Sequence, residues 1–166
     1  MTQKDTVKFD AKSRSAARMA AVQALYELDM VEGDPDPVLR AFIEKHWNVP
    51  VENEDGDEIG EAEFIDPDTT HLIAVVRGVL DKKPAIDELL EGTLGENWTV
   101  ARIEVLLRAI LRSGTYELLH CPQTPAKVII NEYMDVANAF YTGSEPKMVN
   151  GVLDKLAHVL RDGRMD

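Results

Sequence analysis

Apolar residues recur every three or four positions along most of the chain, which is the spacing that places them on one face of an α-helix. The first such segment begins after Ser13 or Ser15, either of which can cap a helix, and it ends at Gly33. Because several of its inward positions are alanines, this helix is expected to approach its neighbours closely. These positions are Ala17, Ala21, Ala24, Leu25 and Leu28.

The same spacing predicts helices through the rest of the chain. Pro84 is expected to break or kink one of them, and Thr99 to cap the most apolar one. This most apolar helix is hydrophobic around much of its circumference and should be central. With about seven helices, mostly short loops and no convincing strand, the sequence predicts an all-α protein with antiparallel neighbours. The helices after the first are placed at about 37–47, 69–83, 86–92, 100–118, 126–141 and 145–160.

The charge of the chain is unevenly distributed. The net formal charge is −12, and a uniformly acidic surface would repel nucleic acid. Residues 48–68, however, hold nine acidic residues and no lysine or arginine, whereas residues 1–18 hold five basic residues and two acidic ones. We interpret residues 48–66 as a solvated acidic loop, and residues 1–12, which are polar, basic and without a period, as a flexible arm. The net charge therefore says little about the working face.

The residues themselves exclude several classes of chemistry. The single cysteine, Cys121, rules out an intramolecular disulfide and a cysteine-based zinc site. No nucleotide-binding glycine loop and no hydrolase or metalloprotease motif is present, so no cofactor is expected. There is no secretory pattern and no apolar segment long enough to span a bilayer, so we expect a soluble, cytoplasmic protein that does not bind membranes.

One group of residues on the central helix can be interpreted chemically. Glu117, His120 and Cys121 are spaced so that they share a helix face, where they could form a metal site or activate the thiol. The alternative is a histidine at a helix end beside a half-buried cysteine. We favour this structural alternative because metal and thiol sites normally recruit more ligands or an orienting base.

Nucleic-acid binding is better supported. Lys12, Arg14 and Arg18 lie on the basic arm and the helix after it, and the two arginines are four positions apart, so they share a face from which they can neutralise phosphates. Lys147 follows the turn Gly143–Ser144 at another helix start, where an anion can also bind. Both features have a plainer alternative, because basic residues near a terminus are most often merely solvated and the turn can be a simple cap.

Four segments carry motifs that occur together in one known family. They are Arg14-x-x-x-Arg18 followed by Ala21–Tyr26, then Leu111–Leu118, Pro125–Glu132 and Lys147–Lys155. In this order they resemble the NusB family of bacterial transcription antitermination factors, with a poorly matched segment at 33–100 in which the acidic loop looks like an insertion. The resemblance implies an all-α fold of two small antiparallel helical bundles, at about 13–95 and 96–163 of one domain spanning 13–163.

The resemblance also implies a function. Proteins of this family have no catalytic activity and bind the boxA element of ribosomal RNA transcripts together with NusE, a small ribosomal protein. The pair then joins RNA polymerase and other Nus factors in an antitermination complex. The implied RNA contacts are Arg14 and Arg18, with Lys12 beside them, and Lys147 and Met148 at the start of the last helix. Many members carry an aromatic residue at the position of Met148, so a stacking surface worth ~1–3 kcal/mol per base is absent here.

Several alternatives stay open. Tyr26, at the exposed edge of the first helix, can bind a partner protein or lie half-buried. We interpret Gly114 and Gly151 as allowing close helix packing. We interpret Asn131, Glu132 and Asn150 as making structural hydrogen bonds rather than touching RNA. The main alternative function is a helical protein–protein adaptor without specific RNA binding. An RNA-modifying enzyme is disfavoured because the sequence has no glycine-rich cofactor loop.

Overall fold

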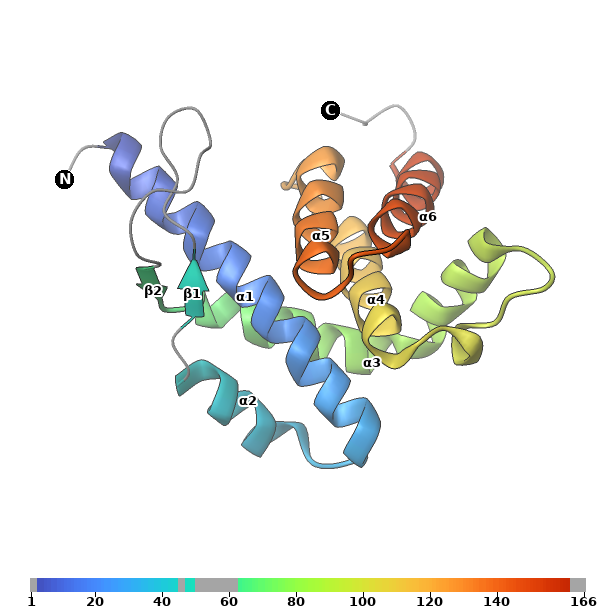
Figure 1. Cartoon of the computed structure of the whole chain (residues 1–166), viewed down its shortest axis with the longest axis horizontal. Coiled ribbons are helices and arrows are strands. Elements are labelled where there is room, and N and C mark those ends of the chain that lie inside the picture. The colour runs from blue at the N-terminus through green and yellow to red at the C-terminus, as the bar shows by residue number, and fades with distance from the viewer. Residues whose placement is uncertain (1–2, 45–46, 50–62, 162–166) are drawn as a thin grey trace.

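The computed structural model describes residues 3–44, 47–49 and 63–161. These ranges form six α-helices, a short 3-10 helix and a two-stranded hairpin (Figure 1), so the predicted all-α fold is confirmed. Within them, no helix is both long and apolar enough to cross a membrane. The elements are α1 (Gln3–Val31), α2 (Pro35–Glu44), β1 (Trp47–Val49), β2 (Glu63–Ile65), α3 (Thr69–Leu94), η1 (Val100–Arg102), α4 (Val105–His120), α5 (Ala126–Phe140) and α6 (Glu145–Leu160).

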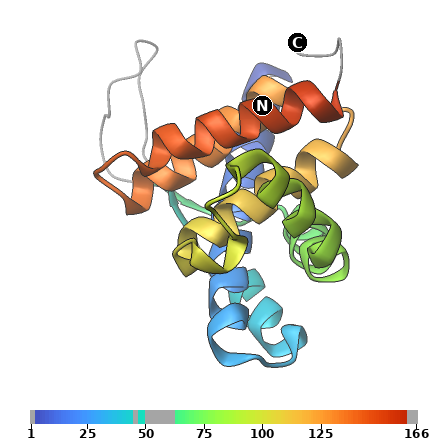
Figure 2. The ribbon, with the colours of Figure 1, turned by 90° about the vertical axis from the view of Figure 1, so that its right-hand side faces the viewer.

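The helix α4 lies at the centre of the molecule, as its apolar sequence predicts. Ten of its 16 residues are buried, and it packs against α1, α3, α5 and α6 (Figures 1 and 2). The helix α1 also packs on α3, and α5 packs on α6. Because α4 contacts both pairs of helices, the division of the chain near residue 95 into two bundles stays a prediction.

The amino-terminal arm differs from the prediction. The helix α1 begins at Gln3, well before Ser13, so residues 3–12 are helical, and the flexibility expected of this arm stays a prediction. This part of the helix needs no apolar period because it extends beyond the helices that form the core (Figure 1). Lysine and glutamine, which occur there, are good helix formers.

A short hairpin was also not expected from the sequence. The strands β1 and β2 pair antiparallel, with Trp47 opposite Ile65 and Val49 opposite Glu63. Strands of three residues are too short to give a recognisable alternation of apolar and polar positions. The hairpin flanks the acidic loop, of which residues 50–62 lie outside the described residues.

The helix α3 is continuous through Pro84, where the sequence predicts a break or a kink. It bends along its length but does not break (Figure 1). Proline cannot donate a backbone hydrogen bond, but the turns on either side are held in the core by Val79 and Ile86. The helix begins at Thr69 and is capped by Asp68, whose side chain accepts a hydrogen bond from the backbone N–H of His71.

The start of α4 corrects a second prediction. Thr99 precedes η1 rather than α4, and its side chain makes no capping hydrogen bond. The cap of α4 is Glu104, whose carboxylate accepts hydrogen bonds from the backbone N–H groups of Leu106 and Leu107 at 3.1 and 3.2 Å. The central helix therefore begins five positions later than a cap at Thr99 suggests, at Val105.

The two glycines assigned to close packing behave differently. A Cβ atom on Gly114 would lie 2.7 Å from Cδ1 of Leu153, so this glycine does allow α6 to approach α4. A Cβ atom on Gly151 would meet nothing within 4 Å, so the packing role expected for Gly151 is wrong. Gly151 lies on the exposed face of α6, where a side chain would point into solvent.

Candidate nucleic-acid interface

The basic residues predicted on α1 do not share one environment. The side chain of Arg14 is 49% exposed, and Lys12 is half-buried. The side chain of Arg18 is only 2% exposed. Positions four apart on a helix differ by about 40° in direction, and here this offset turns Arg18 into the core beside Ala17 and Ala21. The expectation that Arg18 contacts phosphate is therefore corrected, because its guanidinium is not accessible.

Arg18 is the centre of a buried polar cluster. Its Nε and Nη2 atoms donate hydrogen bonds to Oε2 and Oε1 of Glu117 at 2.9 and 3.0 Å. The hydroxyl of Tyr133 donates to the same carboxylate, and Nε2 of His71 lies 3.1 Å from its Oε1. Glu132 lies 3.6 Å from Nη1 of Arg18. These residues, which we call the Arg18 cluster, join α1, α3, α4 and α5.

Arg18 and Glu117 keep their charges at neutral pH, because the pKa of each is shifted away from neutrality. Burial acts to raise the pKa of Glu117, but the neighbouring His71 and Arg18 side chains outweigh it and lower the pKa to about 2. Burial likewise acts to lower the pKa of Arg18, and the hydrogen bond with Glu117 more than compensates. Burial and the negative charge of Glu117 raise the pKa of Tyr133 well above its usual value. Arg18 and Glu117 thus form a buried ion pair, to which the hydroxyl of Tyr133 donates a hydrogen bond.

One signal in the sequence points to this cluster. Glu117 is an acidic residue on the most apolar helix of the chain, and a buried carboxylate needs a partner.

Glu132 also accepts a hydrogen bond from Ser15 at 2.8 Å, which joins α1 to α5. The structural hydrogen bond expected for Glu132 is thereby confirmed, whereas Asn131 and Asn150 are exposed, so that expectation stays a prediction for them.

The second group of predicted residues lies at the start of α6. Lys147 is exposed, and Met148 is half-buried against the core. Ser144, before the first turn, makes no capping hydrogen bond with its side chain. The helix α5 packs against both α1, which carries Arg14, and α6, so it lies between these two helices (Figure 1). A ligand that touches both groups would have to run across α5.

A groove surrounds Tyr26 in the carboxyl-terminal half of α1. The side chain of Tyr26 is 39% exposed, and Met30, Val31 and Phe140 are also exposed large apolar residues. Two carboxylates, those of Glu27 and Glu104, belong to the lining. We call this feature the Tyr26 groove; it is lined by Gln23, Tyr26, Glu27, Met30, Val31, Phe42, Glu104, Leu106 and Phe140.

The candidate metal or thiol site on α4 is not formed. Glu117 is committed to Arg18, while His120 is exposed, with its ring 5.0 Å from that of Tyr116. Burial raises the pKa of the Cys121 thiol, which disfavours the reactive thiolate. No group of three or more histidine, cysteine or acidic side chains among the described residues is arranged to hold a metal ion.

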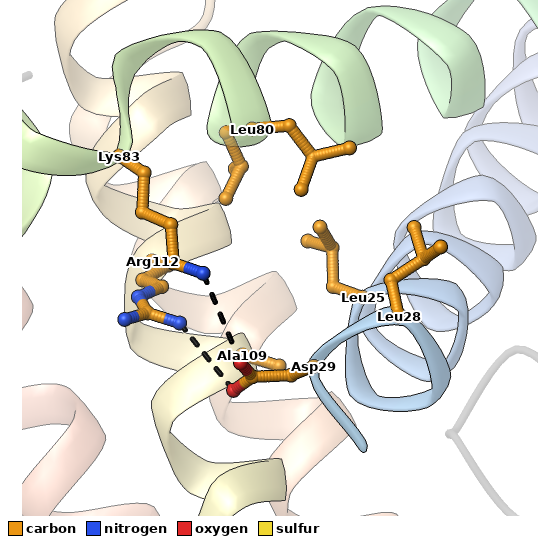
Figure 3. Close-up of a pocket in the computed structure, with 8 residues that line it drawn as sticks. Leu25, Leu28, Asp29, Leu80, Lys83, Ala109 and Arg112 are labelled. Atoms are coloured by element: carbon orange, nitrogen blue, oxygen red, sulfur yellow. Dashed lines mark ion pairs between the residues drawn. The ribbon is translucent and has the colours of Figure 1, made fainter. Parts of the chain in front are cut away.

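A second charged cluster fixes the carboxyl-terminal half of α1. Asp29 accepts hydrogen bonds from Nε and Nη2 of Arg108 at 3.1 and 2.7 Å. Its carboxylate also lies 3.5 Å from Arg112 and 3.8 Å from Lys83, beside a small pocket (Figure 3). Burial acts to raise the pKa of Asp29, but the hydrogen bonds from Arg108 outweigh it and lower the pKa. The two clusters together fix α1 against α3 and α4.

Comparison with known proteins places the chain in a family. The family model described as the NusB family matches residues 15–158, which is most of the chain. The chain belongs to the NusB family. The resemblance to the NusB family that the four motifs indicate is thereby confirmed. The match begins at Ser15, so it includes Arg18 and leaves Arg14 one residue outside.

Relatives and solved structures agree with this assignment. The chain is 40% identical to the transcription antitermination protein NusB of Rhodopseudomonas palustris (strain BisB18), over 91% of this chain and 85% of the relative. It is 38% identical to the protein of the same name from Bartonella quintana (strain Toulouse), over 91% of this chain and 92% of the relative. The structure of T. maritima NusB matches with a TM-score of 0.68 and 27% identity, covering 87% of this chain and 89% of that one. A structure of NusB and NusE with double-stranded RNA matches with a TM-score of 0.68, covering 89% of this chain and 98% of that one; at 19% identity it shows the shared fold alone.

Proposed function

We propose that this NusB-family protein is a non-catalytic RNA-binding transcription antitermination factor. In this proposal it binds the boxA element of ribosomal RNA transcripts together with NusE, and the pair joins RNA polymerase and other Nus factors. The observation that carries the proposal is the family match over residues 15–158. Relatives that are 38–40% identical over nine-tenths of the chain bear the name transcription antitermination protein.

The proposed RNA surface runs from Arg14 and Lys12 on α1 to Lys147 and Met148 on α6. Arg14 and Lys147 are exposed, so their charges can neutralise phosphates. Met148 offers part of its thioether side chain to a base, with less stacking surface than an aromatic residue. Arg18 takes a positioning role, because the buried cluster fixes the rotation of α1 and thereby the side on which Arg14 lies.

The proposed surface for NusE is the Tyr26 groove. Its exposed apolar residues offer area for a protein partner, and its carboxylates, Glu27 and Glu104, suit a partner with a basic surface. This separates the two ligands along α1, with RNA toward Arg14 and the protein toward Tyr26.

The alternative is a helical protein–protein adaptor without specific RNA binding. The net charge of −12 and the burial of one of the two arginines expected to bind RNA favour it. It retains the Tyr26 groove as its working surface and assigns no RNA contact to Arg14 or Lys147.

Fluorescence anisotropy with labelled boxA RNA and a scrambled RNA distinguishes the two functions. The titrations are repeated with and without NusE and over a series of salt concentrations. The RNA-binding factor should prefer boxA, and NusE should strengthen the preference. Equal and feeble binding of both RNAs in the presence of NusE would leave the adaptor function.

The Arg14→Ala variant tests the RNA surface. It should weaken binding and flatten the log–log salt dependence by about 0.7, the value for one phosphate of a single strand. The matched control is Arg40→Ala, because Arg40 is an exposed arginine on α2. If both variants lose the same small amount of affinity, Arg14 does not contact RNA.

A further inference from the structure

Arg14 already has an anionic partner within its own chain. Its Nε atom lies 3.9 Å from Oδ2 of Asp68, and the two side chains are 49% and 32% exposed. An ion pair this open to solvent is weak, typically contributing about 0.2–1 kcal/mol. A second anion can therefore reach the same guanidinium, and it must compete with Asp68 when it does.

The carboxylate of Asp68 is held in place from two directions. Its Oδ1 accepts a hydrogen bond from the backbone N–H of His71 at 3.1 Å, which caps α3 and leaves Oδ2 toward the guanidinium. The backbone N–H of Asp68 donates to the carbonyl of Ser13 at 2.9 Å. The hydroxyl of Ser13 donates to the carbonyl of Asp66, also at 2.9 Å. The segment that carries Asp68 is thus attached to the turn of α1 that carries Arg14.

We propose that Asp68 competes with RNA phosphate for Arg14 and thereby sets the affinity of this part of the RNA surface. The inference rests on the proposed function. A phosphate that approaches Arg14 meets a carboxylate that cannot turn away without giving up the cap of α3. An RNA held at Lys147 or through a protein partner tolerates this competition better than an RNA held by Arg14 alone. Asp68 therefore disfavours RNA that is held nonspecifically.

The Asp68→Asn variant removes the competing charge and keeps the cap, because asparagine caps helices about as well as aspartate. The matched control is Asp36→Asn, which removes the same charge from an exposed ion pair with Arg77. Asp36 follows the end of α1 at Val31, which is about 25 Å along the helix axis from Arg14. Both variants are titrated with labelled boxA RNA at several salt concentrations.

Asp68→Asn should bind the RNA about two- to fivefold more tightly than Asp36→Asn, which is the gain from releasing an exposed ion pair. Its log–log salt dependence should be steeper by up to about 0.7. In the background of Arg14→Ala, the advantage of Asp68→Asn over Asp36→Asn should disappear. Urea unfolding of each variant verifies that the cap of α3 is intact, and Asp68→Ser, a second uncharged cap, repeats the comparison if Asp68→Asn is destabilised.

The outcomes separate this inference from the proposed function. If Arg14→Ala weakens RNA binding but Asp68→Asn binds no more tightly than Asp36→Asn, the competition by Asp68 is refuted and the RNA surface stands. If Arg14→Ala leaves RNA binding unchanged, the role of Arg14 fails and the inference fails with it. An advantage of Asp68→Asn that persists without Arg14 would also refute the competition, because it would come from a different contact.

Discussion

The substitution Glu117→Gln should strongly destabilise this protein. The carboxylate of Glu117 is fully buried and accepts two hydrogen bonds from Arg18 and one from Tyr133. Glutamine has nearly the same shape but no charge, so the substitution leaves the buried guanidinium of Arg18 with only the more distant carboxylate of Glu132, at 3.6 Å, as a counter-ion. Removing one partner of a buried ion pair typically costs about 3–5 kcal/mol. Domains are commonly stable by about 5–15 kcal/mol, so the loss would be a large part of the total.

Urea unfolding followed by circular dichroism at neutral pH measures this loss. The matched control is Glu88→Gln on the exposed face of α3, which should change the free energy of unfolding by less than about 0.5 kcal/mol. The double variant Arg18→Met with Glu117→Leu removes both charges and should lose less than the sum of the two single variants. A Glu117→Gln variant within about 1 kcal/mol of Glu88→Gln would refute the view that the Arg18 cluster holds the helices together.

Four further predictions concern the pH dependence of the Arg18 cluster, two glycines and the Tyr26 groove. The pKa of Glu117 is about 2 in the folded protein against an ordinary 4.5, so its ionised form contributes stability that is present above pH 4.5 and lost as the pH falls toward 2. Over that window the wild type should lose about 3 kcal/mol more than Glu117→Gln in urea unfolding, and equal losses would contradict the assignment. Gly114→Ala should cost about 1–3 kcal/mol because its Cβ would lie 2.7 Å from Leu153. Gly151→Ala, which meets open space, should instead gain about 0.5–1 kcal/mol in the same assay. Tyr26→Ala should weaken NusE binding about tenfold or more in calorimetry while leaving binding of boxA RNA alone unchanged, and equal losses for both ligands would show that the groove is not specific to the protein partner.

The helical fold was accessible from the sequence because each core helix shows its own apolar face. The central place of α4 follows from apolar residues that point in different directions around the helix. Ile110 and Leu111, about 100° apart, are both buried. The failures occurred where the signal is not an apolar period. Residues 3–12 form helix although their sequence shows no apolar period, and Thr99 resembles a cap although Glu104 supplies the hydrogen bonds. At the start of α4 the decisive interaction is made by the carboxylate of Glu104, which no apolar period reveals.

The candidate site was only partly accessible for a related reason. The spacing of Arg14 and Arg18 correctly predicts that their side chains leave α1 about 40° apart. The spacing cannot tell which of the two side chains faces the core. That is decided by Glu117, which is 99 positions away from Arg18 in the sequence. The partner of Arg14 is likewise remote, because Asp68 reaches α1 through a segment in which no apolar period is visible.

The burial of Arg18 changes how mutations of the basic motif should be interpreted. Arg18→Ala would remove a buried charge from Glu117, loosen α1 from α4 and displace Arg14 on the same helix. Such a variant would lose RNA binding without Arg18 ever touching RNA. A loss of affinity at position 18 is therefore evidence for a phosphate contact only if the free energy of unfolding is unchanged, and the cluster predicts that it is not. Arg14→Ala carries no such ambiguity, because the side chain of Arg14 is half exposed and its partner Asp68 also remains in solvent. The motif thus combines one buried arginine that positions the helix with one exposed arginine that, under the proposed function, exchanges its carboxylate partner for a phosphate.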